Sequence, residues 1–147
     1  MSVSILKKFG YPNHLIKDYT NWIILLRPEQ ITIGSLVLIE KSFQKKFSKV
    51  TLKSLQELSI IIKEVENTLK KLFGYNKINY LMLMMVDPEV HLHVIPRYSK
   101  NIVFNKKSFS DTGWPKLPEL NYVNKIDINT RKKLINTIKS KFNTVDK

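Results

Sequence analysis

The chain has 147 residues and a mass of 17.3 kDa, which is a length typical of one domain, and its 43% hydrophobic and 10% aromatic content excludes a disordered or collagen-like protein. It contains no cysteine, so disulfides, thiolate metal sites and a cysteine nucleophile are excluded. The net charge of +13 comes mostly from scattered lysines, with only three arginines, which favours a solvated basic surface over a nucleic-acid groove.

Two apolar segments near the N-terminus predict neighbouring strands. Trp22–Leu26 is apolar throughout, which is typical of a strand buried on both faces, and Pro28 ends it because proline cannot donate to a sheet. Ser35–Ile39 follows Gly34 and has the same character. We expect these two strands to pair in one antiparallel sheet.

A long helix is predicted between Thr51 and Phe73. Apolar residues recur there at spacings of three and four, the helical period. These residues are Leu55, Leu58, Ile62, Val65, Leu69 and Leu72. Ser48 or Thr51 can cap the start of the helix, and Gly74 can adopt the left-handed conformation after its end. One face of the helix should lie on the sheet.

Two more strands are expected after this helix. Lys77–Val86 has strand character, Asp87-Pro88 predicts a tight connection, and Val90–Arg97 forms the next strand. The element order predicts an α+β fold with a mainly antiparallel sheet, one long helix packed on it and a C-terminal helix.

The remainder of the chain is predicted to pack back on this body. Its polar, proline-rich part is too long for a simple hairpin. A last helix begins near Asn129 or Thr130, either of which can cap it. We expect a single domain over residues 1–147, in which residues 99–147 form a C-terminal extension.

The candidate chemistry lies on the Val90–Arg97 strand. Because side chains alternate across a strand, Glu89, His91 and His93 point to one side, which should be an open surface, while the intervening apolar residues face the core. Imidazoles there can supply a nucleophile and donors to phosphate. Two alternatives remain: a surface decoration, and a metal site, for which the available ligand set is thin.

The segment Val90-His-Leu-His-Val-Ile-Pro-Arg97 resembles the signature of the histidine triad nucleotide hydrolases and transferases. Phe9-Gly10, the strand Trp22–Leu26 and Gly34 before the second strand also resemble the N-terminal half of that family, particularly its fragile histidine triad branch. The resemblance covers about residues 9–98.

The resemblance implies a role for each matching residue. His91 falls on the family's nucleophile, which attacks the α-phosphate of a nucleotide, and His93 falls on the last histidine of the triad, which contacts phosphate oxygens. Glu89 stands where the family has its first histidine, and this is a departure. We assign His91, His93 and Glu89 as catalytic residues.

The substrate contacts also depart from the family pattern. Arg27 and Ser35 stand at positions that contact ribose in the fragile histidine triad branch, and Arg97 can reach phosphate through its planar guanidinium. We therefore assign Arg27, Ser35 and Arg97 to substrate binding, with substrate choice left open by the substitutions.

These features predict a nucleotide hydrolase or nucleotidyl transferase that acts at the α-phosphate, for example of a dinucleoside polyphosphate, through a covalent nucleotidyl-histidine intermediate. The alternatives are a non-catalytic nucleotide-binding protein with an altered triad, and a metal-dependent enzyme that uses His91, His93 and Glu89. No cofactor is required, although Mg²⁺ can accompany a polyphosphate. The resemblance implies a homodimer.

No apolar run reaches the ~20 residues of a membrane span and no secretory signal is recognisable, so a cytoplasmic protein without a membrane or nucleic-acid partner is expected.

Overall fold

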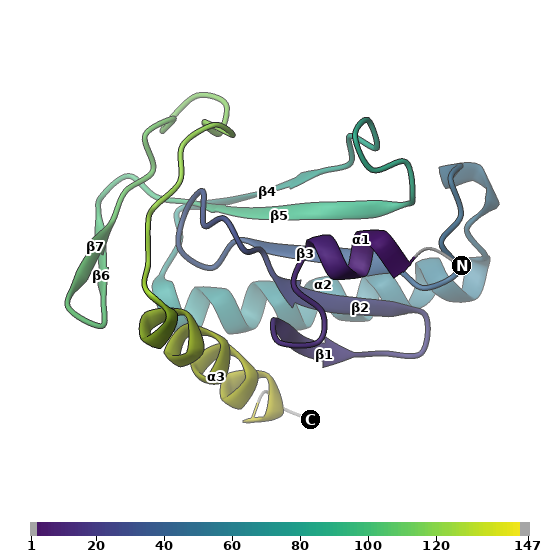
Figure 1. The fold of residues 1–147 in the computed structure, drawn as a ribbon, viewed down its shortest axis with the longest axis horizontal. Coiled ribbons are helices and arrows are strands. Elements are labelled where there is room, and N and C mark those ends of the chain that lie inside the picture. Colours follow the sequence, from purple (N-terminus) through teal and green to yellow (C-terminus); the bar gives the residue numbers. More distant parts are fainter. Residues whose placement is uncertain (1–2, 145–147) are drawn as a thin grey trace.

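The structure is a computed structural model and describes residues 3–144 (Figure 1). The sheet strands are β1 (Leu15–Asp18), β2 (Trp22–Leu26), β3 (Leu36–Glu40), β4 (Lys77–Leu81) and β5 (His91–Arg97). The remaining elements are α1 (Val3–Lys8), the short 3₁₀ helix η1 (Phe47–Lys49), α2 (Leu52–Phe73), the hairpin strands β6 (Ile102–Phe104) and β7 (Lys107–Phe109), and α3 (Ile128–Thr144). None of the described helices has the length and apolar character needed to cross a bilayer.

All neighbouring strands of the main sheet run antiparallel, in the order β1-β2-β3-β5-β4. The predicted pairing of the first two apolar strands is confirmed, because Leu25 lies opposite Val37 in the β2–β3 register. Both strands are buried along their whole length. The α+β fold class predicted from the sequence is therefore confirmed.

Helix α2 begins and ends where the sequence predicts. The Thr51 side chain accepts a hydrogen bond from the Ser54 amide, and Gly74 closes the helix in the left-handed conformation with φ 62°. Val65 and Leu69 of the predicted apolar stripe are fully buried, and Leu58 and Leu72 pack against the same core, whereas Leu55 is 36% exposed. Ile61, which lies outside the predicted stripe, is also fully buried. Four of the six predicted residues therefore face the core.

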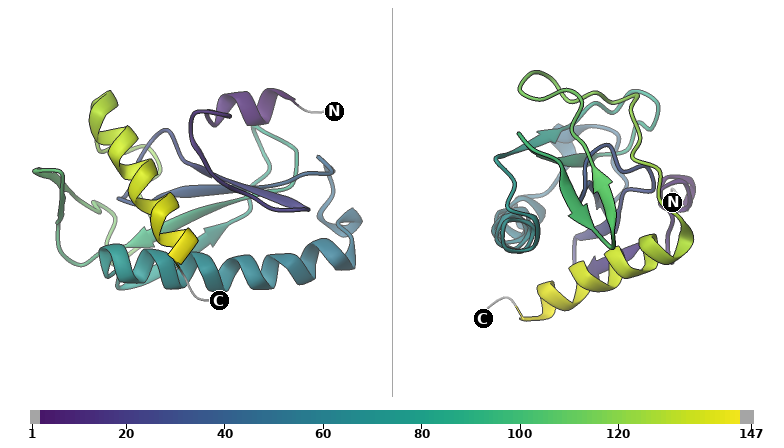
Figure 2. Two further views of the ribbon diagram at one scale, coloured as in Figure 1. Left: turned by 90° about the horizontal axis from the view of Figure 1, so that it is seen from below. Right: turned by 90° about the vertical axis from the view of Figure 1, so that its left-hand side faces the viewer.

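Helix α3 packs on α2 and on β1, so both long helices cover one side of the sheet (Figure 2). Its predicted N-terminal region is right, but the capping residue is Asp127, whose Oδ1 accepts a hydrogen bond of 2.8 Å from the Thr130 amide. Neither Asn129 nor Thr130 caps the helix, because both follow Ile128, its first residue.

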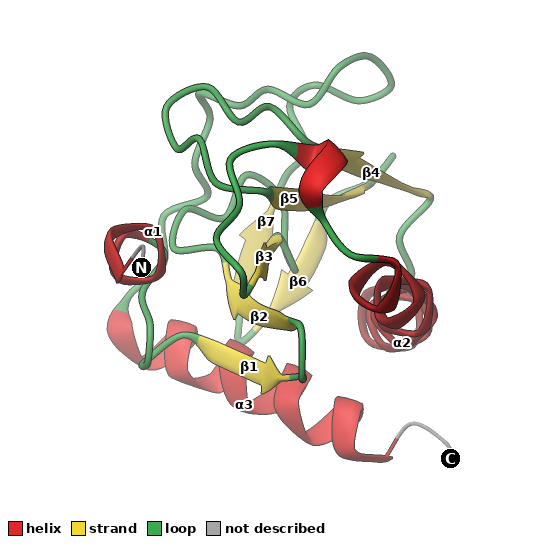
Figure 3. Ribbon diagram, turned by 90° about the vertical axis from the view of Figure 1, so that its right-hand side faces the viewer, coloured by secondary structure: helices red, strands yellow, loops and turns green. Residues whose placement is uncertain are grey.

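Helix α1 lies on the opposite side of the sheet from α2 (Figure 3). Ile5 and Phe9 pack there against apolar side chains of β2 and β3, in a second buried cluster that also contains Ile23, Leu25, Val37 and Ile39. The sequence shows no clear period in its first twenty residues, which form α1 and β1 in the structure. The sheet consequently has a helix on each face.

The connection between β4 and β5 is longer than predicted. Strand β4 ends at Leu81, and residues 82–90 form a loop in which Met84 has a left-handed φ of 52° and Met85 is 84% exposed. The prediction of a tight turn at Asp87-Pro88 is therefore wrong.

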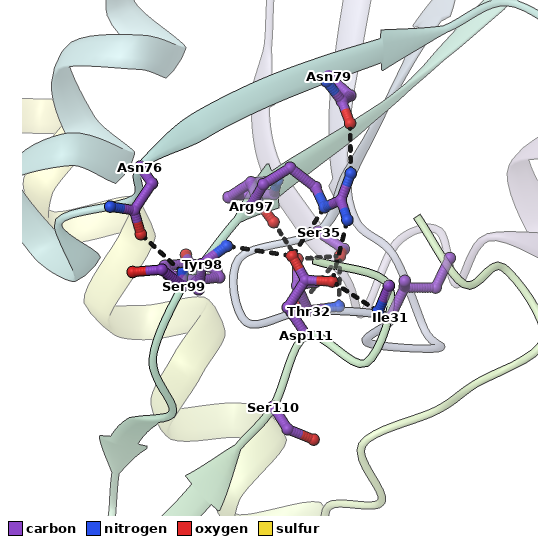
Figure 4. A network of polar contacts seen from close by, with 12 residues as sticks. Ile31, Thr32, Ser35, Asn76, Asn79, Arg97, Tyr98, Ser99, Ser110 and Asp111 are labelled. Atoms are coloured by element: carbon purple, nitrogen blue, oxygen red, sulfur yellow. Dashed lines mark hydrogen bonds and ion pairs between the residues drawn. The ribbon is translucent and has the colours of Figure 1, made fainter. Parts of the chain in front are cut away.

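The C-terminal part is fastened to the sheet by a buried ion pair, as the prediction that it packs back requires (Figure 4). Arg97 on β5 donates from Nε to Asp111 Oδ2 at 2.7 Å and from Nη1 to Asn79 Oδ1 at 2.8 Å. The side chains of Arg97 and Asp111 are only 4% and 1% exposed. Asn124 adds a further tie, because its amide donates to the carbonyl oxygens of Gln30 and Ile31.

Candidate functional site

A cavity of about 220 Å³ lies over the start of β5, on the face of the sheet that carries α1. Its walls come from the end of α1, the segment after β2, the β4–β5 loop and β5 itself. The lining residues are Lys8, Phe9, Arg27, Glu29, Leu83, Met84, Met85, Val86, Asp87, His91 and His93. The structure thus brings three of the six predicted site residues, His91, His93 and Arg27, to one cavity.

The prediction of an open surface around the histidines is wrong. His91 is only 2% exposed, because α1 and its following residue Phe9 cover this face of the sheet. The ring centroid of Phe9 lies 6.0 Å from that of His91 and 5.9 Å from that of His93. The sequence gives no periodic signal for this cover, although Phe9 belongs to the family-like segment. The histidines still line a cavity that contains charged groups, so they are not enclosed in apolar packing alone.

The main chain fixes the proton on His91. Nδ1 of His91 lies 2.6 Å from the carbonyl oxygen of Glu89. A carbonyl oxygen can only accept, so Nδ1 carries the proton, and in the neutral ring Nε2 keeps its lone pair. This tautomer is the one that makes Nε2 a nucleophile.

Glu89 contributes to the site through its backbone. Its residue is 7% exposed, and its side chain is absent from the cavity lining in the described part of the chain. What His91 contacts at position 89 is the carbonyl oxygen, which any amino acid would supply. This contact therefore does not depend on which side chain stands at position 89.

His93 is held beside Arg27. Nε of Arg27 lies 3.4 Å from Nδ1 of His93, and the rings of His93 and His91 meet edge to face with centroids 4.9 Å apart. Burial lowers the pKa of His93 to about 4, and the positive charge of Arg27 adds to this effect. His93 is therefore an uncharged imidazole near neutral pH.

The two cations of the cavity each have a carboxylate nearby. Lys8 forms an ion pair of 2.6 Å with Asp87, which links the end of α1 to the β4–β5 loop. Arg27 donates from Nη1 to the Glu29 carbonyl oxygen at 2.9 Å, and the Glu29 carboxylate lies 4.0 Å away. The Asp87 and Glu29 side chains are 19% and 66% exposed, so both pairs are reached by solvent.

The other predicted site residues lie elsewhere. Ser35 is fully buried and donates from its hydroxyl to the Thr32 carbonyl oxygen at 2.8 Å, within the turn before β3. Arg97 is committed to Asp111 and Asn79. Neither Ser35 nor Arg97 lines this cavity among the residues that the structure describes. Glu89, as noted, reaches the site through its carbonyl group.

Within residues 3–144, no group of three or more histidine, aspartate or glutamate side chains is arranged to hold a metal ion. Asp87 lines the cavity with both histidines, but it is paired with Lys8. The third histidine, His14, contacts the Leu26 carbonyl oxygen through Nδ1 at 3.1 Å and is absent from the cavity lining.

Comparison with known proteins gives a consistent result at the level of structure. No model of a known protein family matches the chain, and no curated protein matches its sequence. A histidine triad protein of Sinorhizobium meliloti superposes with a TM-score of 0.74 at 19% identity, covering 95% of each chain, and one of Bradyrhizobium japonicum with 0.72 at 18%, covering 97% of each. A hypothetical histidine triad nucleotide-binding protein of Sulfolobus tokodaii has a TM-score of 0.65 at 14% identity, covering 90% of this chain and 85% of that one. The chain therefore has the α+β fold of the histidine triad proteins.

Proposed function

We propose that the chain is a nucleotide hydrolase or nucleotidyl transferase that acts at the α-phosphate through a covalent intermediate on His91. The observation that carries the proposal is the 2.6 Å contact between His91 Nδ1 and the Glu89 carbonyl oxygen, which leaves Nε2 unprotonated in a neutral ring. The cavity around it holds two cations, Lys8 and Arg27, which suit an anionic substrate.

The chemistry takes two steps. The lone pair on His91 Nε2 attacks the α-phosphorus, the P–N bond forms, and the bond to the leaving phosphate oxygen breaks with its electron pair. Water or an acceptor hydroxyl then attacks phosphorus and loses its proton to solvent, and the P–N bond breaks with its electron pair returning to Nε2, which restores the neutral imidazole. His93 donates a hydrogen bond to a phosphoryl oxygen as charge develops, and one such preorganised donor contributes about 3–4 kcal/mol to transition-state stabilisation.

The substrate class follows from the resemblance to the fragile histidine triad branch, whose expected substrates are dinucleoside polyphosphates. The Sulfolobus tokodaii neighbour is described as nucleotide-binding, which supports a nucleotide ligand for this chain too. A cavity of about 220 Å³ is smaller than the roughly 300–1,000 Å³ of most ligand sites. The phosphate under attack fits beside His91, and the rest of the substrate extends past Phe9 and the β4–β5 loop.

We further propose a cytoplasmic homodimer that needs no resident metal, with Mg²⁺ entering only as the counterion of a polyphosphate. In this proposal Arg27 contacts phosphate, which its position in the cavity lining supports. Ser35 and Arg97 are left out of the proposed substrate contacts, since both are committed to intramolecular bonds.

The test is to trap the intermediate. The protein is incubated with a dinucleoside polyphosphate that carries an α-phosphate label, with and without chelator, quenched, and mapped by peptide mass spectrometry. We expect the label on His91 in the wild type and in the control variant His14→Gln, which alters a histidine outside the cavity. His91→Ala should carry no label. Label on another side chain, or normal turnover by His91→Ala, would overturn the assignment of the nucleophile.

A second variant tests position 89. Because the carbonyl oxygen of residue 89 makes the contact with His91, Glu89→His should keep or raise turnover, as measured by product formation under the same conditions. Complete loss would mean that the carboxylate itself has a catalytic role.

A non-catalytic nucleotide-binding protein is the second candidate, and the near-complete burial of His91 favours it. Tight binding of a nucleotide by calorimetry, without product or label, would support this candidate against the first. Activity that chelator abolishes would instead indicate a metal-dependent enzyme.

A further inference from the structure

Arg27 and His93 meet across the width of one strand. Arg27 follows the end of β2, His93 lies on β5, and β3 runs between these two strands. In the register of the sheet, Leu25 lies opposite Val37, which lies opposite His93. Since side chains alternate along a strand, Arg27 continues the face that carries Leu25 and therefore points to the side of His93.

The Arg27 side chain is held in this position by several contacts. Its Nη1 donates to the Glu29 carbonyl oxygen at 2.9 Å, and the side chain is only 15% exposed. Its main chain is fixed as well, because its amide donates to the Ser35 carbonyl oxygen at 3.0 Å and its own carbonyl oxygen accepts from the Gln30 side chain at 2.7 Å. The guanidinium therefore meets His93 from a defined direction.

The chemistry of the pair fixes the proton on His93. A guanidinium has only donors, so in the 3.4 Å contact between Arg27 Nε and His93 Nδ1 the imidazole nitrogen must accept. An accepting Nδ1 carries no proton, and the single proton of the neutral ring is then on Nε2. A doubly protonated His93 would turn an N–H toward a permanent cation.

We propose that Arg27 is a positioning residue that keeps His93 uncharged, with its proton on Nε2, so that the Nε2 atoms of the two neighbouring imidazoles differ in protonation: His91 presents a lone pair and His93 presents an N–H. This inference rests on the proposed function for its catalytic meaning, but the proton positions can be measured without any substrate.

The same arrangement gives His91 and His93 different protonation states and therefore different functions. The Glu89 carbonyl oxygen accepts from His91, and the Arg27 guanidinium donates to His93, so the two rings are constrained by partners of opposite polarity. A phosphate held between them would meet a nucleophile from one ring and a donor from the other. Arg27 thus acts on a substrate through His93 in addition to any direct contact.

Other charges around His93 come from each element packed against it. They are His91 on β5, Lys8 at the end of α1, Asp87 in the β4–β5 loop, and Glu29 beside Arg27. Asp87 raises the pKa of His93, which opposes the effects of Arg27, His91 and Lys8. Lys8 is the matched control for Arg27, because it is a second cation of the same cavity that donates a hydrogen bond to Asp87 instead of to an imidazole.

The experiment is nuclear magnetic resonance of the full chain with ¹⁵N-labelled histidine, in which only three side chains contribute signals. We expect the wild-type spectrum to show His93 protonated on Nε2 and not on Nδ1, with a titration midpoint near 4. In Arg27→Met the midpoint should move up toward 6.5, the ordinary value, and a population with the proton on Nδ1 should appear. Lys8→Met should shift the midpoint less and leave the proton on Nε2.

Two spectroscopic results would each overturn the inference. One is a wild-type His93 with its proton on Nδ1, which needs no variant to observe, and the other is an Arg27→Met spectrum in which His93 titrates as in the wild type. Kinetics supply an independent readout. A rise in KM alone in Arg27→Met, with an unchanged pH profile of kcat, would mean that Arg27 only binds phosphate and would also contradict the proposal. Failure to trap a label on His91 bears on the proposed function and leaves the spectra unchanged.

Discussion

Removing the negative charge of Asp111 should strongly destabilise the protein. The carboxylate accepts from Arg97 at 2.7 Å through Oδ2 and at 3.2 Å through Oδ1, and it also accepts from the amides of Tyr98 and Gly113. In Asp111→Asn, the almost fully buried guanidinium of Arg97 would lose its counter-charge, and two of its donors would face an amide that cannot accept at both ends.

The expected loss is about 3–5 kcal/mol in the free energy of unfolding, the range found when one partner of a buried ion pair is removed. Asp18→Asn provides the matched control. Asp18 pairs with Lys41 at 2.7 Å, but these side chains are 48% and 36% exposed. An exposed pair contributes at most about 1 kcal/mol, because water and salt screen it.

Urea denaturation followed by circular dichroism measures both variants. The Asp111→Asn midpoint should fall well below that of Asp18→Asn, with the slope unchanged if both proteins unfold in one transition. A loss of less than about 1 kcal/mol in Asp111→Asn would refute the view that this ion pair fastens the C-terminal part to the sheet.

Three further predictions concern the cavity and the sheet. Because the folded-state pKa of His93 lies below 6.5, the contribution of this residue to stability is complete above pH 6.5 and is lost as the pH falls through about 4. The difference between the two pKa values corresponds to about 3 kcal/mol, which solvent at the partly exposed ring reduces to about 2 kcal/mol. Denaturation at several pH values should therefore show that the stability of His93→Gln depends less on pH than that of the wild type. Phe9→Ala should uncover His91, so acylation of this imidazole by diethyl pyrocarbonate, followed by mass spectrometry, should be faster than in the wild type, and an unchanged rate would contradict the covering role of Phe9. Gly34→Ala should cost more than about 1–2 kcal/mol in thermal denaturation, because its φ of 85° is left-handed and the new Cβ would also lie 3.2 Å from the Phe73 ring. The control Gly74→Ala has a left-handed φ of 62° as well but meets open space, so it should cost less.

The main elements of the fold could be predicted where local pattern and burial agree. The strand Trp22–Leu26 and the helix ending at Gly74 follow from composition and period, and both have the predicted bounds within a residue. The predicted end of the Lys77–Val86 strand was wrong, because the apolar run continues to Val86 whereas the backbone leaves the sheet after Leu81. Apolar composition alone does not separate a strand from an apolar loop.

The cover over the histidines could not be predicted for a different reason. Helix α1 has only six residues, too few to establish a period, and its position is set by contacts with residues such as Val37 that are distant in sequence. Alternation along Val90–Arg97 placed His91 and His93 on one face, and the structure confirms that they share it. The contacts of these rings with Arg27 and with the Glu89 carbonyl group depend on tertiary structure, so a local sequence pattern cannot predict them.

The contact between His91 and the carbonyl oxygen of Glu89 has a consequence for mutagenesis. Every genetically encoded residue at position 89 carries the same acceptor, so scanning that position with natural amino acids reports on the side chain and leaves the acceptor intact. Replacing the peptide link between residues 89 and 90 with an ester, by chemical synthesis, would weaken the acceptor itself while the side chain remains.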